Sequence, residues 1–421
     1  MFQEADWPTL DWLLLSLTMT LCVMLSIAAA TVCFISLLHI SLPVGIADRH
    51  KLHFFEFLLR MGNEVLGWVV ELLFGPVIRN KFTRIIISIP FLLRRRPPSW
   101  VTVTNETLNG VATRIYRPKQ RSSNAAIVFI HGGGWATMNP EYYDALVVKL
   151  IHHLGVLVIS IDYQLSPESP FPGPVEECDK VITGLMLKDY TKFDIDPGRI
   201  CVMGDSAGGN LGAVICQRCL RRKGPMPKCQ VLLYPVIHGF DLKSPSYQMY
   251  YKLYNYAALL SPHSMARWIL LYLGIPATQT NVRKLKANKH IRPEERKNYR
   301  SLFGHELLPS AFVKSELYDK PADNKWDEEL AAKFRENGYN PDFAPIMGTE
   351  LEGLSPAMVV TCGFDVLRDE GALYVRHLRE YSVPVLWNHY PSAYHGVLNM
   401  PRSDQRDEIV KDIVNYLVKA L

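Results

Sequence analysis

The chain has 421 residues, of which 48% are hydrophobic and 21% are charged, and its formal net charge is +5. This length suits one large α/β domain with extra segments, or two domains. Because the charge is modest and no long basic run occurs, we do not expect nucleic acid as a partner. Eight cysteines in this length do not make a disulfide scaffold. Cys216 and Cys219 have C-x-x-C spacing but lack the second Cys or His pair of a metal site, so no metal is expected.

The first feature along the chain is a run without Asp, Glu, Lys or Arg from Trp12 to Ala47. Its apolar part, residues 13–40, can span a hydrocarbon core of roughly 30 Å. A soluble core rarely contains so long a charge-free stretch. A cleaved signal peptide has a basic start and a short apolar core, whereas Glu4 and Asp6 precede this run. We therefore predict an uncleaved membrane anchor within residues 1–47, with the lipid bilayer as its partner.

Two signals disagree about the orientation of this anchor. Arg49, Lys51 and Arg60 follow the span, and the positive-inside rule would then place the bulk of the chain in the cytosol. Asn105, however, begins an Asn-Glu-Thr sequon, which can be glycosylated only on the lumenal side. The residues alone leave the topology open.

The next region, residues 48–98, stays unusually apolar. Its apolar run at residues 65–78 is interrupted by Glu71, Gly75 and Pro76, and a second run ends at three arginines, residues 94–96. Each run is short for a membrane span and has basic residues beside it. We expect amphipathic helices that cover the following domain or lie in the membrane surface beside the mouth of its site, and both can hold together.

From residue 99 to 421 short strands alternate with helices. An antiparallel pair is expected around the turn at Asn109-Gly110. Continuous apolar runs, typical of central strands buried on both faces, occur at residues 126–130, 156–161, 200–203, 231–234 and 358–362, and a late strand at 383–390. This alternation predicts an α/β fold with a mostly parallel sheet flanked by helices. Residues 240–345 interrupt it, and we expect them to form a lid or acyl pocket.

Two glycine-rich motifs directly follow two of these strands, at the edge where such sheets bind ligands. The run HGGGW at residues 131–135 supplies backbone N–H groups that can approach a negative oxygen closely. The run GDSAGG at residues 204–209 fits G-x-S-x-G, a strand-to-helix turn that exposes a serine. Ser206 is the predicted nucleophile, and Gly132, Gly133 and Ala207 are the predicted oxyanion donors. The other motif positions are His131, Gly134, Gly204, Asp205 and Gly208.

A serine nucleophile needs an imidazole to take its proton and an acid to orient that imidazole. His395 lies in a loop after the last predicted strand, whereas His377 is predicted on a helix surface and His389 inside a strand. Asp365 is the acidic residue nearest the end of the strand 358–362. Asp369 and Glu370 fit better as charges in the first turn of the next helix. We predict that Asp365 orients His395. Either glycine-rich motif alone is typical of a tight turn, but both with an Asp and a His in this order indicate acyl transfer.

These motifs resemble the hormone-sensitive-lipase branch of the α/β-hydrolases. The resemblance rests on HGGGW, the run DYQLSPE at residues 162–168, GDSAGGN at 204–210, Asp365 in DVLRDE and His395 in YHG. The apolar N-terminus, VTVT at residues 101–104 and YPV at 234–236 resemble the arylacetamide deacetylase group within that branch. The resemblance covers nearly the whole chain.

This resemblance implies the α/β-hydrolase fold and a serine esterase with Ser206, Asp365 and His395 as its triad. It also implies a single-pass type II protein of the endoplasmic reticulum with a lumenal catalytic domain, and in that compartment we expect the sequon at Asn105 to be glycosylated. One departure concerns a cysteine that follows HGGGW in this group and can pair with one near the acid. Here Ala136 occupies that place, so Cys362 lacks the partner.

The sequence therefore predicts a membrane-anchored hydrolase of hydrophobic esters, or of amides, that needs no cofactor. A lipase acting on neutral lipids, such as acylglycerols or sterol esters, differs only in substrate. A catalytically silent binding protein on the same fold is the alternative from another class, but such proteins usually lack the serine or the histidine.

Overall fold

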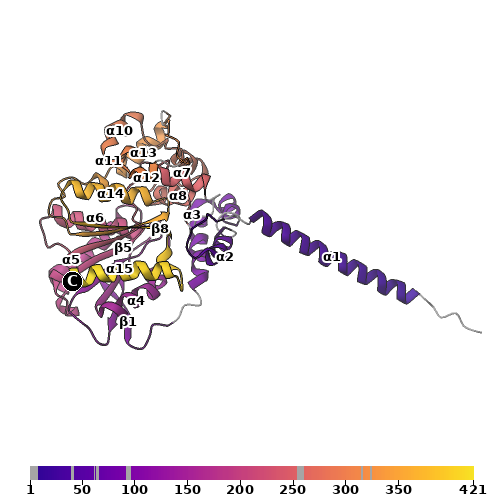
Figure 1. The fold of residues 1–421 in the computed structure, drawn as a ribbon, viewed down its shortest axis with the longest axis horizontal. Helices are drawn as coiled ribbons and strands as arrows, with labels where there is room; N and C mark the ends of the chain where they lie inside the picture. The colour runs from indigo at the N-terminus through magenta and orange to yellow at the C-terminus, as the bar shows by residue number, and fades with distance from the viewer. Residues whose placement is uncertain are drawn as a thin grey trace, which may run out of the picture. The chain divides into compact units, whose positions relative to one another are not determined.

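The computed structural model describes residues 8–38, 42–60, 62, 66–91, 96–253, 260–313, 316–322 and 325–421. The chain forms two compact units, Met1–Ser41 and Leu42–Leu421 (Figure 1). The first unit contains helix α1 (Pro8–Leu38), in which Trp12–Phe34 is 23 residues long with a mean hydropathy of 2.2. By length and composition this segment can cross a membrane. The last two residues of the predicted span, 39 and 40, lie outside the described residues.

In the second unit the described residues form an eight-stranded sheet with the order β1-β2-β4-β3-β5-β6-β7-β8. The strands are β1 (Val101–Leu108), β2 (Val111–Pro118), β3 (Ala126–Ile130), β4 (Leu157–Asp162), β5 (Ile200–Asp205), β6 (Cys229–Leu233), β7 (Ala357–Phe364) and β8 (Val385–Tyr394). Strand β2 pairs antiparallel with β1 and β4, and every other pair is parallel. The mostly parallel α/β sheet predicted from the sequence is confirmed.

Helices cover both faces of this sheet, and α6 and α14 lie on one side in Figure 1 while α4 and α15 lie on the other. Accordingly, every residue of β3, β5 and β6 is buried. The flanking helices are α4 (Asp144–Leu154), α5 (Gly173–Gly184), α6 (Ala207–Arg221), α14 (Arg368–Glu380) and α15 (Asp404–Ala420). The continuous apolar runs of the sequence reflect this cover on two faces.

A helical segment lies between β6 and β7, although these two strands are neighbours in the sheet. Its helices are α7 (Pro245–Lys252), α8 (Pro262–Tyr272), α9 (Gln279–Lys286), α10 (Pro293–Asn298), α11 (Arg300–Phe303), α12 (Ser310–Val313) and α13 (Glu328–Gly338). This segment corresponds to the predicted insertion at residues 240–345. Two more helices precede the sheet in sequence: α2 (Arg49–Arg60) and α3 (Gly67–Ser88).

The register of the strands places their carboxyl ends at one edge of the sheet. Ile130, the last residue of β3, pairs with Gly204 of β5. At the far side of the sheet, Phe364 of β7 pairs with Tyr394 of β8 after a local irregularity at Cys362. Strand β8, which was predicted at residues 383–390, extends four residues further, to Tyr394. The loops that follow these strands therefore begin side by side.

Candidate active site

Ser206 lies on the turn between β5 and α6, where its backbone has φ 55° and ψ −119°. Few non-glycine residues adopt a positive φ, and neighbouring backbone holds this one in place. The Ser206 N–H donates to Leu233 O at 2.9 Å, and the Val236 N–H donates to Ser206 O at 3.2 Å. The turn also needs Gly204, since a Cβ there would lie 2.3 Å from Gly208 O. The local sequence thus forces a sharp turn with the serine at its apex.

His395 connects the hydroxyl of Ser206 to the carboxylate of Asp365. Its Nε2 lies 3.0 Å from Ser206 Oγ, and its Nδ1 lies 2.9 Å from Asp365 Oδ2. Asp365 and His395 come one residue after Phe364 and Tyr394, which pair at the ends of β7 and β8. The sheet register therefore brings the acid and the base together, although 30 residues separate them in sequence.

The surroundings of the three side chains fix their orientation. Asp365 is 2% exposed, and its second oxygen, Oδ1, accepts the Leu367 N–H at 2.9 Å. The ring of Tyr234 lies against the imidazole of His395 with 4.8 Å between the ring centroids. A carboxylate on Nδ1 leaves Nε2 free to accept a proton from the serine, which is the tautomer that proton transfer requires.

The HGGGW loop lies beside this turn, and its first glycine differs from the prediction. The Gly132 N–H donates to Asp205 Oδ1 at 2.8 Å and lies 3.1 Å from Tyr143 Oη. The assignment of Gly132 as an oxyanion donor is therefore wrong, because its N–H already has acceptors. Gly133 and Gly134, with φ of 102° and 60°, have no acceptor for their N–H groups within the described part of the chain.

Ala207 supplies the other predicted donor. It is the first residue of α6, so its N–H has no acceptor within the helix. A helix N-terminus also carries partial positive charge, which favours a negative oxygen. The N–H groups of Gly133, Gly134 and Ala207 are thus left without an acceptor among the described residues, in the two loops that follow β3 and β5.

The buried carboxylate of Asp205 holds the HGGGW loop in place through hydrogen bonds. Asp205 accepts hydrogen bonds from the Gly132 N–H and from Tyr143 Oη, the latter at 3.0 Å. Burial raises the pKa of Asp205 to about 6, although both hydrogen bonds oppose the shift. His131 stacks on Tyr163 with 4.3 Å between ring centroids, and burial lowers its pKa to about 4. The stacked ring of His131 and the hydrogen bonds of Asp205 therefore hold the loop in its conformation.

Two further acids near Asp365 hold the loop after β6. Glu370 Oε2 accepts the N–H groups of Ile237 and His238 at 2.9 and 3.1 Å. Burial raises the pKa of Glu370 to about 8. Asp369 accepts the Ser246 N–H at 2.7 Å. Both lie in the first turn of α14, as predicted, but each also contacts the chain entering the insertion.

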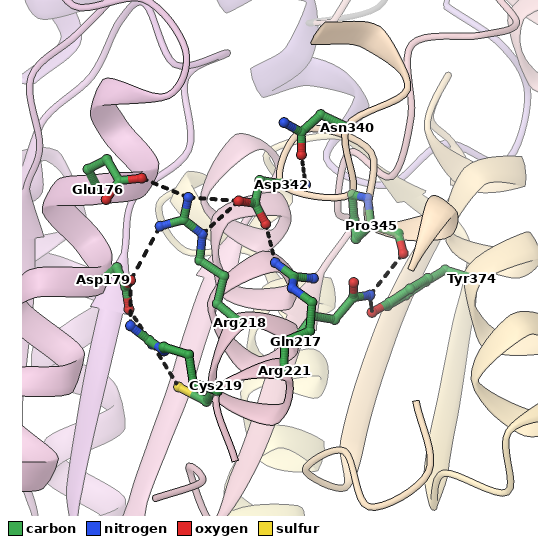
Figure 2. Close-up of polar contacts among 11 residues, drawn as sticks. Glu176, Asp179, Gln217, Arg218, Cys219, Arg221, Asn340, Asp342, Pro345 and Tyr374 are labelled. Carbon is green, nitrogen blue, oxygen red and sulfur yellow. Dashed lines mark hydrogen bonds and ion pairs between the residues drawn. The ribbon is translucent and has the colours of Figure 1, made fainter. Parts of the chain in front are cut away.

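Figure 2 shows how residues 217–221 of α6 are bonded to neighbouring segments. Arg218 contacts Glu176 of α5 at 2.7 Å and Asp342 at 2.8 Å. The Gln217 amide donates to Pro345 O at 2.8 Å and to Tyr374 Oη of α14 at 3.0 Å. These contacts join α6, which follows Ser206 directly, to the end of the insertion, so α6 cannot shift without breaking two buried hydrogen bonds of Gln217 and the ion pairs of Arg218.

Four other positions singled out from the sequence take no part in these contacts. His377 is 4% exposed, and its Nε2 lies 2.9 Å from Gly348 O, so its predicted surface position is wrong. His389 lies on β8 and contacts Thr361 Oγ1, which agrees with a structural role. Asn105 lies exposed on β1, and Cys362 is a buried free thiol on β7.

Sequence reasoning missed Tyr143 and Asn210. The Asn210 side chain donates to Val236 O at 3.1 Å and to Phe343 O at 2.8 Å, joining the start of α6 to two distant loops. Only GDSAGGN itself pointed to Asn210, and no motif marked Tyr143. A nucleophile turn, an ordered imidazole and free backbone N–H groups at the strand ends define the α/β-hydrolase class of protein.

Comparisons with known proteins agree with this class. A family model described as the alpha/beta hydrolase fold matches residues 127–313 and 306–399. Arylacetamide deacetylase of Oryctolagus cuniculus is 33% identical, with 71% of this chain and 75% of the relative covered. Neutral cholesterol ester hydrolase 1 of Rattus norvegicus is 30% identical, with 90% and 92% covered. A hyperthermophilic esterase from the archaeon Pyrobaculum calidifontis has a TM-score of 0.61 at 25% identity, with 85% and 98% covered. The chain belongs to the arylacetamide deacetylase family of α/β-hydrolases.

Proposed function

We propose that this protein is a serine hydrolase that cleaves hydrophobic carboxylic esters, with Ser206, His395 and Asp365 as its catalytic triad. The observation that carries the proposal is the continuous chain of two hydrogen bonds, 3.0 and 2.9 Å long, from the Ser206 hydroxyl to the Asp365 carboxylate. The relatives named as a deacetylase, a cholesterol ester hydrolase and an esterase support the same reaction class.

The reaction has two acyl-transfer steps. Ser206 Oγ attacks the carbonyl carbon while His395 Nε2 takes the hydroxyl proton, and the carbonyl oxygen becomes an oxyanion. The tetrahedral intermediate collapses, the alcohol leaves with the proton from His395, and the acyl group stays on Ser206. Water then attacks this ester and gives a proton to His395, and as the second tetrahedral intermediate collapses His395 returns that proton to Ser206 Oγ, which releases the acid and restores the serine. Asp365 holds His395 in the required tautomer and stabilises the imidazolium.

The N–H groups of Gly133, Gly134 and Ala207 are the proposed oxyanion donors. Fixed donors of this kind stabilise the charge that develops in the transition state, and loss of one typically lowers turnover about 10²–10³-fold. Gly134 replaces Gly132 in this role because Asp205 occupies the Gly132 N–H.

Helix α1 is the proposed membrane anchor, and the substrates are esters that partition into lipid, with amides as a possible second class. The 23-residue apolar segment Trp12–Phe34 supports the anchor. Sterol esters and other neutral lipids fit this setting, and the name of the rat relative favours them. The intact triad argues against a catalytically silent binding protein, which would not need all three groups aligned.

The proposed location is the endoplasmic reticulum membrane, in a type II orientation with residues 42–421 in the lumen. The exposed sequon residue Asn105 on β1 supports it. A glycosidase should increase the electrophoretic mobility of the wild-type protein and leave Asn105→Gln unchanged. Equal mobility of treated and untreated wild type would contradict the lumenal orientation.

The function itself is tested by hydrolysis of p-nitrophenyl acetate and of a long-chain sterol ester in lipid nanodiscs. Wild type should hydrolyse both, and Ser206→Ala should lose about 10⁴–10⁶-fold in kcat because the acyl-enzyme cannot form. Equal rates for wild type and Ser206→Ala would remove Ser206 from the reaction.

A further inference from the structure

Helix α3 is kinked at Gly75, which has φ 82° and precedes Pro76, and the part before this kink presents an apolar ridge to the outside of the unit. Several of its large side chains are exposed at helical spacing, among them Trp68 (55%), Val69 (40%), Leu72 (69%), Leu73 (65%) and Phe74 (65%). A surface helix of a soluble protein turns its apolar stripe to the core and its charges to water. Contiguous exposed apolar patches of this kind mark contacts with membranes or other proteins.

The polar face of α3 is the buried one. Arg79, Asn80 and Thr83 are at most 8% exposed. Glu71 Oε2 accepts hydrogen bonds from Arg267 Nη2 of α8 at 2.8 Å and from Gln279 Nε2 of α9 at 2.9 Å. The side chains of Glu71, Arg79 and Asn80 thus bond to the protein, while the large apolar side chains before Gly75 are left outside.

The same buried face contacts the HGGGW loop. Asn80 Nδ2 and Arg84 Nε donate to Ala136 O at 3.2 and 2.8 Å. On the neighbouring helix α8, the ring of Trp268 lies so close to Gly134 that a Cβ there would be 2.4 Å from it. Helix α3 therefore connects an exposed apolar ridge to the loop that carries two proposed oxyanion donors.

We propose that the exposed face of α3, the ridge formed by Trp68, Val69, Leu72, Leu73 and Phe74, inserts into the surface of the lipid bilayer. This proposal rests on the proposed function, because it makes the bilayer the source of the ester. Docking places the site against the lipid, so that a hydrophobic substrate enters without crossing water.

A bilayer is the occupant that the chain itself favours. The apolar segment of α1 ends at Phe34, and the second unit begins at Leu42. Eight residues reach at most about 30 Å even when fully extended. If α1 spans the membrane, Leu42 at the start of the second unit therefore stays within that distance of the lipid surface. A helix with an apolar ridge is then suited to lie in the interface plane.

The first test measures the depth of position 73 in the full chain. Leu73→Cys is made with Cys22 and Cys33 replaced by Ser, since these are the exposed cysteines of the described chain. An environment-sensitive fluorophore is attached, and the protein is placed in phosphatidylcholine nanodiscs with doxyl-labelled lipids. The label at 73 should be strongly quenched, whereas a label at the equally exposed Val418→Cys of α15 should not be. Equal quenching at both positions would overturn the proposal.

The second test separates docking from catalysis. Leu72→Asp/Leu73→Asp should leave hydrolysis of p-nitrophenyl acetate within about twofold of wild type. It should lower hydrolysis of a sterol ester in the same nanodiscs about tenfold, because charges in the ridge oppose insertion. Val418→Asp is the matched control and should change neither rate. An unchanged sterol-ester rate in the double variant would contradict docking.

The two proposals fail in different ways. A quenched label at position 73, together with a wild type that hydrolyses neither ester, would reject the esterase and keep the docking face. An unquenched label with normal hydrolysis of both esters would reject only the docking face. An unquenched label together with dimers in nanodiscs would assign the ridge to a second copy of the chain, and would also reject the bilayer.

Discussion

The strand-end edge of the sheet and the helices that cover it are built in different ways. At the edge, Ser206, Asp365 and His395 each follow directly from a strand end, and pairing such as Phe364 with Tyr394 brings them together. Among the covering helices, single side-chain bonds join distant segments, as between Glu71 of α3 and Arg267 of α8, which are 196 residues apart. Backbone register therefore places the chemistry, while scattered side-chain bonds place what surrounds it.

The largest effect on kcat is expected from a substitution in the proposed triad at the strand-end edge of the sheet. Asp365→Asn keeps the size of the side chain but favours the wrong tautomer of His395, so kcat should fall about 10⁴-fold. Asp369→Asn, four residues later, is the control and should leave kcat per folded molecule near wild type. Steady-state kinetics with p-nitrophenyl acetate measures both. Equal losses in the two variants would show that Asp365 acts only through structure.

The next effect concerns the glycine loop. Gly133 has φ 102°, and a Cβ there would lie 2.3 Å from Thr137 O. Gly133→Ala should therefore displace the N–H groups beside Ser206 and lower kcat about 10²–10³-fold, with less change in KM. Full activity of this variant would contradict the assignment of the loop to the oxyanion.

A smaller effect on kcat is expected from a substitution in the helices that cover this edge. Asn80→Ala removes a buried donor to Ala136 O and Ser166 O, which should lower the free energy of unfolding by about 1–3 kcal/mol. Its kcat should fall less than tenfold, because the loop keeps its bonds from Arg84. Thermal melting in detergent and ester kinetics measure the two quantities. A loss of kcat as large as that of Gly133→Ala would show that helix α3 itself positions the N–H groups proposed to bind the oxyanion.

The smallest effect is a pH dependence of stability at Glu370. Burial raises its pKa from the ordinary 4.5 to about 8. Between these values the folded protein holds a proton that the unfolded chain releases, so this group makes stability fall as pH rises. Glu370→Gln removes the titration, and its melting temperature relative to wild type should rise from pH 5 to pH 8. A difference that does not change with pH would show that Glu370 is ionised in the folded protein.

The sequence predicted the sheet and the meeting of Ser206, His395 and Asp365 because each depends on local patterns. Continuous apolar runs indicate strands covered on both faces, and G-x-S-x-G specifies its own turn. The choice of Gly132 as a donor failed because the acceptor, Asp205, is 73 residues away. His377 was misplaced for the same reason, since Gly348 covers it from a distant loop. Contacts between remote segments leave no periodic signal in the sequence.

The triad is tested most directly by locating the adduct of a fluorophosphonate on the full-length protein by peptide mass spectrometry. Wild type should carry one adduct, on Ser206, and His395→Ala should react far more slowly because its serine keeps its proton. An unmodified Ser206 in folded wild type, or equal labelling of the two proteins, would contradict a nucleophile activated by His395.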